Sequence, residues 1–154
     1  FLFGRIGNSI LVSIILVLII IVSGALFYNV TIPTNNLPAL LITLIIGAAT
    51  FSSLGIAVTT IIRNEDAAPA IVNASILPLL FISDIFIPMH EAPNWLNTIT
   101  HIFPVKPFSA ALQTAFNPFE VGSGFELTNI GIMIIWLILG LLVSIRYFSW
   151  EPRD

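Results

Sequence analysis

Long apolar runs separated by short polar breaks set the pattern of this chain. No Asp, Glu, Lys or Arg occurs between Arg5 and Arg63, and one crossing of a bilayer takes roughly 20 residues. The gap is too long for one membrane-spanning helix and about right for two. The break between the two is marked by a cluster of turn-forming residues, Asn29, Pro33, Asn35, Asn36 and Pro38. This pattern predicts spans over residues 6–27 and 38–62.

Two further apolar runs, over residues 67–87 and 127–145, predict a third and a fourth span. Between them, apolar side chains recur at helical spacing in two short amphipathic pieces, residues 94–103 and 107–116. Each piece is roughly 15 Å of helix, too short for a hydrocarbon core of about 30 Å. We expect an outer hairpin over residues 91–118, which either lies flat in the interface or dips into the membrane and returns against protein.

The composition requires lipid as the main solvent of the chain. Hydrophobic residues make up 57% and charged residues 8%, whereas a soluble domain carries about 25% charged residues. The polar side chains are too few to cover a water-exposed surface. We therefore predict an all-α membrane protein, one transmembrane domain over residues 1–154 with four spans and two short re-entrant or interfacial helices on the outer side.

The few charged residues predict the orientation. With four spans, both ends of the chain share one side with Arg5, Arg63, Arg146 and Arg153, and only Lys106 lies on the other. Arginine and lysine favour the cytoplasmic side, so both ends are expected to be cytoplasmic. Lys106 is expected to reach the lipid headgroups on the outer side.

Several function classes are excluded by what the sequence lacks. Five Lys+Arg provide no basic face for nucleic acid, and the absence of cysteine excludes disulfides and thiolate zinc sites. No G-x-x-x-x-G-K-[S/T] motif occurs, so this chain does not bind and hydrolyse ATP itself. His90, Glu91 and His101 fit no standard metal-ligand spacing. We assign no catalytic, cofactor-binding or metal-binding residue.

Small residues recur on one face of the second span. Ala48, Ser52, Gly55 and Thr59 are spaced by four, three and four, which places them on one side of a helix. In lipid such a face lets two helices approach closely. Packing against a neighbouring span is favoured over the alternative, a lining for a transport path.

Three residues of the third span are candidates for a role in transport. Asp84 lies seventeen residues beyond Ala67, or about 25 Å along a helix, and so near the outer boundary. A hydrated or capping carboxylate is the favoured interpretation, with substrate contact and proton coupling as alternatives. Pro78 predicts a kink, and Asn73 is interpreted as an interhelical hydrogen-bonding residue rather than a substrate contact.

The residues around the hairpin resemble a known family. Four segments carry the resemblance: Leu54-Gly55-Ile56, NASILPLLFISDIFIP over residues 73–88, PNWL over 93–96, and Phe103-Pro104. Together they resemble the permease subunit of ABC-2-type transporters. The segment FSWEPR over 148–153 is similar to the C-terminal end of actinobacterial drug-export permeases of this type. The match corresponds to spans three to six of a six-span permease. Two departures are the absent first two spans with their ATPase-docking loop, and Asp84 where the family usually has glycine.

The resemblance implies a function and partners. It implies a permease in the plasma membrane of a bacterium, paired with a second permease copy and with cytoplasmic ATPase subunits that hold ATP and Mg²⁺. The expected reaction is outward translocation of a hydrophobic or amphipathic substrate. Candidate residues for the transport path or gate are Asn73, Pro78, Asp84, Trp95 and Phe103. A non-transporting membrane scaffold is the main alternative, and an intramembrane enzyme is disfavoured because buried acid–base pairs are lacking.

Overall fold

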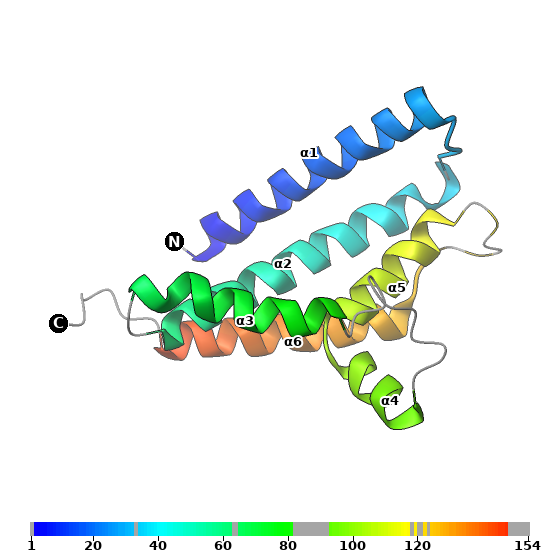
Figure 1. Ribbon diagram of the computed structural model, residues 1–154. Helices are drawn as coiled ribbons and strands as arrows, with labels where there is room; N and C mark the ends of the chain where they lie inside the picture. Colours follow the sequence, from blue (N-terminus) through cyan, green and yellow to red (C-terminus); the bar gives the residue numbers. More distant parts are fainter. Residues whose placement is uncertain are drawn as a thin grey trace.

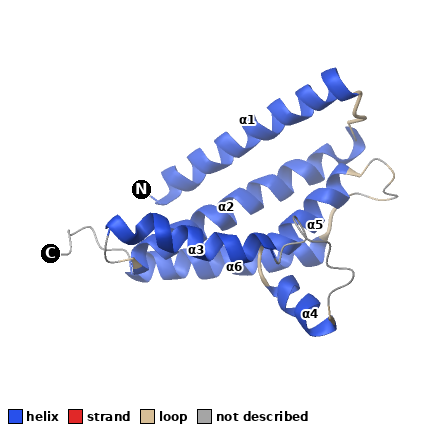
Figure 2. Ribbon diagram, in the orientation of Figure 1, coloured by secondary structure: helices blue, strands red, loops and turns tan. Residues whose placement is uncertain are grey.

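All regular secondary structure in the described part of the chain is helical (Figures 1 and 2). The computed structural model describes residues 2–32, 34–62, 65–81, 93–117, 119, 122 and 124–147. The elements are α1 (Leu2–Tyr28), η1 (Thr34–Asn36), α2 (Leu37–Ile61), η2 (Glu65–Ala67), α3 (Ala68–Phe81), α4 (Asn94–Ile102), α5 (Val105–Phe116) and α6 (Leu127–Tyr147). The predicted all-α class is therefore confirmed.

Three helices are long and apolar enough to cross a membrane: Leu2–Tyr28, Thr34–Thr60 and Leu127–Tyr147. They overlap the predicted first, second and fourth spans. The described part of the predicted third span is α3, whose 14 residues extend only about 21 Å at 1.5 Å per residue. The rest of that prediction, through residue 87, lies outside the described residues.

The closest helix packing joins α2 to α6. Gly140 of α6 lies directly on α2, because a side chain there would come within 2.5 Å of Ser53 Oγ and 3.1 Å of the Leu54 backbone nitrogen. Two hydroxyls bridge the pair: Thr50 Oγ1 donates to the Met133 carbonyl (3.1 Å), and Ser144 Oγ donates to the Ser53 carbonyl (3.3 Å). Small residues and hydroxyl–carbonyl bonds are the means by which helices associate in lipid.

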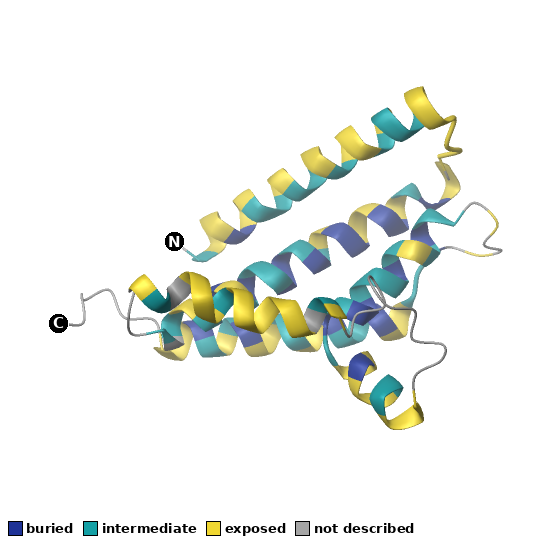
Figure 3. Cartoon of the chain, viewed as in Figure 1, coloured by how far each residue is buried: buried dark blue, intermediate teal, exposed yellow. Residues whose placement is uncertain are grey.

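By contrast, α1 is held by few contacts. Ile6 is its one buried residue among those described and packs in a cluster with Ala49 and Ile56 of α2. Ser9 Oγ donates to Ser52 Oγ at 3.2 Å. Most of the remaining surface of α1 is apolar and exposed (Figure 3), which suits a helix that faces lipid.

The two short helices differ in their packing. α5 lies against both α2 and α6, with Ala111 and Ala115 fully buried, whereas α4 projects from the bundle and packs mainly on α5 (Figure 1). Phe108 of α5 fills the space over Gly47 of α2 and meets Phe51 edge-on, with ring centroids 5.5 Å apart. The predicted hairpin is thus held to the spanning helices mainly through α5.

Contacts among Asn36, Asn117 and Gly124 join the end where α2 and α6 begin to the end of α5. Gly124 has φ +70°, a conformation that favours glycine, and its open side is filled by Asn36, whose Cγ would lie 2.9 Å from an added Cβ. Asn36 is buried and its Nδ2 donates to the Asn117 carbonyl at 3.5 Å. The three segments that meet here are therefore fixed together.

Gly140→Leu tests the α2–α6 contact. The added side chain meets backbone as well as Ser53, so overpacking is expected to lower the free energy of unfolding by about 1–3 kcal/mol. Gly131→Leu is the matched control on the same helix, because nothing lies within 4 Å of its added Cβ. Thermal unfolding in detergent measures both variants, and equal melting temperatures would contradict the assigned contact.

Candidate functional site

The elbow between α4 and α5 lies beside the middle of α6. Trp136 Nε1 donates to the Ile102 carbonyl at 2.6 Å, and its ring stacks on Phe103 with centroids 6.2 Å apart and planes inclined by 17°. Trp136 is nine residues beyond Leu127, or about 13 Å along the helix axis. The carbonyl of Ile102, the last residue of α4, is thus satisfied by a side chain of a spanning helix.

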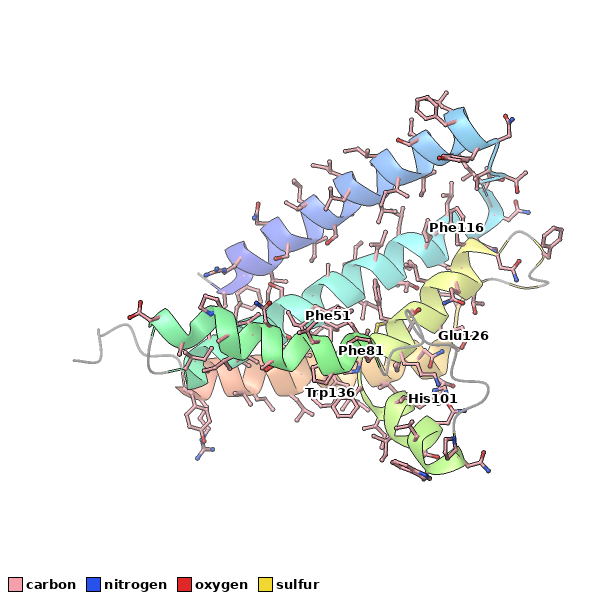
Figure 4. All side chains as sticks on the ribbon, viewed as in Figure 1. Phe51, Phe81, His101, Phe116, Glu126 and Trp136 are labelled. Carbon is pink, nitrogen blue, oxygen red and sulfur yellow. The ribbon has the colours of Figure 1, made fainter. Side chains whose placement is uncertain are left out.

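The other end of α5 lies at the start of α6. Thr114 Oγ1 donates to Glu126 Oε1 at 3.0 Å, and Asn129 Nδ2 donates to Glu126 Oε2 at 2.8 Å. Glu126 and Trp136 mark the two ends of this contact in Figure 4. α5 therefore runs along about half the length of α6. The carboxylate also lies at the positive end of the α6 dipole.

Glu126 and Asn129 were missed in the sequence analysis. The available signal was local: a carboxylate immediately before the last apolar run, followed three residues later by an amide, is typical of a helix start. No sequence pattern indicated the contact of Glu126 with Thr114, because the two residues belong to different elements, α5 and the start of α6.

Lys106 does not reach toward headgroups as expected. Its side chain is 8% exposed, and Nζ donates to Asn97 Oδ1 and to Thr100 Oγ1 (3.2 Å). The prediction was wrong because α4 folds back over the start of α5 and provides polar acceptors there. A buried ammonium is tolerated only with such partners, and in this position it ties the two short helices together.

The predicted gate residues are dispersed over the described structure. Asn73 and Pro78 are exposed on α3, and Trp95 is 65% exposed on α4. Phe103 meets a spanning helix, through its stack on Trp136. Asp84 lies outside the described residues, as do His90 and Glu91 of the rejected metal site. The roles assigned to these residues stay predictions.

The residues of the predicted small-residue face of α2 differ in their neighbours. Ser52 contacts Ser9 of α1, whereas Gly55 has nothing within 4 Å of an added Cβ and Thr59 is exposed. Ala48 is half-buried. The small residues of α2 with the closest neighbours are on another face, at Gly47 under Phe108 and at Ser53 under Gly140.

A groove of about 660 Å³ lies between α1, α2 and α5. Its α1 wall is Val17, Ile20, Ile21 and Gly24, with Val30 following the helix and Leu40 contributed by α2. Its α5 wall is Ser109, Leu112, Gln113 and Phe116, with Asn117 after the helix. The walls are mostly apolar, and none of these side chains is charged. The volume falls in the range of about 300–1,000 Å³ that is typical of small-molecule sites.

The chain was compared with known proteins. Residues 1–146 match the model of a family described as ABC-2 family transporter protein. No curated protein and no solved structure matches the chain. The family match covers every helix of the described structure except the last residue of α6.

Gly47→Val tests the seating of α5 on α2. The added side chain collides with the Phe108 ring and is expected to displace the start of α5. Because the chain has no cysteine, an Ala111→Cys reporter can measure this displacement by maleimide labelling, which should rise several-fold from the low level of a fully buried site. Gly55→Val on the same helix is the control and should leave labelling unchanged; a rise in both variants would point to general loosening instead.

Trp136→Phe tests the elbow contact. An aromatic ring is kept for the stack on Phe103, but the hydrogen bond to the Ile102 carbonyl is lost. Because Ile102 is exposed, the loss should cost the net value of an ordinary hydrogen bond, about 0.5–1.5 kcal/mol of unfolding free energy. Thermal unfolding provides the measurement. The matched control is Trp95→Phe, since that side chain is largely exposed, and a larger effect at Trp95 would refute the assigned role.

Proposed function

This chain belongs to the ABC-2 transporter family, and on that premise we propose that it is the membrane-spanning permease subunit of an ATP-driven exporter. The family is a membrane transport component and not itself catalytic. The proposed substrate class is a hydrophobic or amphipathic molecule moved outward. The observation that carries the proposal is the family match, and the packing of α5 along α2 and α6 agrees with it.

The hairpin is proposed to be re-entrant and not flat. α5 lies against apolar helices that are long enough to cross the membrane, and its elbow contacts α6 about 13 Å from the start of that helix. Non-helical backbone at membrane depth is tolerated where it is buried in protein. The hydrogen bond from Trp136 satisfies the Ile102 carbonyl at the end of α4, and Pro104 of the elbow is buried. Both observations support the re-entrant placement.

The hairpin is proposed to act as the external gate. Lys106 joins α4 to α5, so the two short helices can move as one body. The hairpin is joined to the rest of the bundle along α5, which packs on α2 and α6, and through the Trp136 contacts at the elbow and the Glu126 contacts at the other end. In this mechanism, ATP-driven closure of the ATPases changes the spacing of α2 and α6, and the α4–α5 hairpin shifts with them.

A second permease copy is proposed to cover α3. The described side chains of this helix are mostly exposed and include Ile71, Ile76, Leu77 and Phe81 alongside polar Asn73. A helix that is apolar on all sides suits burial within a larger membrane assembly. We place the transport path along α3 between two copies, with ATP and Mg²⁺ held by separate cytoplasmic ATPase subunits.

The proposed orientation follows the arginines. The start of α1 and the end of α6 lie at the same end of the bundle (Figure 1), and each carries an exposed arginine, Arg5 and Arg146. Positive charge favours the cytoplasmic side. We therefore place this end in the cytoplasm of a cell whose plasma membrane holds the protein, and the hairpin outside.

Purification of the full-length protein from its native membranes tests the proposal. An ATPase with a Walker motif should copurify, and the complex in proteoliposomes should move a fluorescent amphiphile only with hydrolysable ATP. Phe103→Ala, which removes the elbow stack, should lower the rate several-fold with the ATPase still bound. Phe3→Ala, at a residue 85% exposed on α1, should not. Absence of both the ATPase and the flux would favour the membrane scaffold.

A further inference from the structure

The groove between α1, α2 and α5 presents an uncharged polar pair within an apolar setting. Ser109 and Gln113 are four residues apart on one face of α5, and Gln113 Nε2 donates to Ser109 Oγ at 3.0 Å. Neither side chain makes another hydrogen bond to the described part of the chain. The Ser109 hydroxyl hydrogen and the Gln113 carbonyl oxygen therefore remain as a donor and an acceptor at the groove.

The position of this pair makes solvation by water costly. Ser109 lies on α5 between the levels of Trp136 and Glu126 of α6, at hydrocarbon depth if the hairpin is re-entrant. Gln113 is exposed and lies one residue before Thr114, near the level of Glu126. A polar group in hydrocarbon costs several kcal/mol unless it is hydrogen-bonded. The opposite wall, from Val17 to Gly24 of α1, offers only alkyl groups and a glycine backbone. A ligand with an uncharged polar group beside an alkyl chain would satisfy both walls.

The shape of the groove depends on the end of α1. Gly24 has no side chain, its carbonyl accepts a hydrogen bond from the Val30 backbone nitrogen at 3.2 Å, and Asn29 has φ +50°. The chain thus turns back over the end of α1 and closes the groove there. On its long side the groove is bordered by Ile20, which is 69% exposed, so lipid can enter laterally.

We propose that this groove binds a neutral acyl lipid, with its ester or hydroxyl group on Ser109 and Gln113 and its alkyl chain along Val17, Ile20 and Leu112. The absence of charged side chains from the lining disfavours an anionic or cationic headgroup at this depth. The inference rests on the re-entrant placement proposed above and not on ATP-driven transport, so it is tested without an ATPase.

The test uses the full-length protein in phosphatidylcholine nanodiscs and a monoacylglycerol with a photoactivatable diazirine in its acyl chain. Peptide mapping after illumination should place adducts on residues 17–24 of α1 and 109–116 of α5. Gly24→Leu fills the groove and should lower these adducts about tenfold. Gly7→Leu is the matched control on the same helix, because an added Cβ there meets nothing within 4 Å.

A second variant tests the polar pair without filling the groove. Ser109→Ala combined with Gln113→Leu removes the polar pair and should lower monoacylglycerol adducts about five- to tenfold, while a plain alkyl diazirine labels the groove as before. Adducts that are insensitive to both variants would overturn the proposal. So would cross-links that join the groove to another segment of the full-length chain or to a second copy, since protein would then occupy it.

Discussion

The close approach of α2 and α6 is the interaction on which the other elements depend. At Gly140 the two backbones nearly touch, and the contact continues through Ser53 and Ser144 toward one end of the pair. Toward the other end, α5 lies against both helices, with Phe108 over Gly47 and Ala111 clustered with Met133. A helix can fill that half of the bundle only because small residues bring α2 and α6 together in the other half.

Buried hydroxyls reinforce this arrangement without charge. Thr50 donates to carbonyls of both its own helix and α6, and Ser53 donates to the Thr50 carbonyl. In membrane proteins such bonds contribute modestly, about 0.6 kcal/mol on average. The bonds from Thr50 to Met133 and from Ser144 to Ser53 also join particular faces of α2 and α6, and so fix the rotation of one helix relative to the other. That rotation determines which face of α2 meets α5, and so where the hairpin can be seated.

The sequence predicted the elements better than their contacts. Apolar runs of about 20 residues located α1, α2 and α6, and prolines with helical periodicity located α4 and α5, because both signals are local. α2, however, is apolar on nearly every side, so Gly47 and Gly55 look equivalent in the sequence although only Gly47 has a close neighbour. The prediction for Lys106 was wrong for a related reason. Its hydrogen-bond acceptors lie on α4, and the hydrophobic periodicity of the sequence does not show that α4 folds back on α5.

The amphipathic character of α5 has an unusual meaning in this setting. A surface helix in water turns its polar face outward, but α5 buries Ala111 and Ala115 against spanning helices and presents Ser109 and Gln113 to an apolar groove. In lipid that polar face needs a partner of its own. The same helix therefore has two roles in the proposed arrangement: it is held by α2 and α6 beside the elbow, and it meets the proposed lipid on its other side. A change in the spacing of α2 and α6 would alter both contacts at once, which is how movement of the spans could be transmitted to whatever lies in the groove.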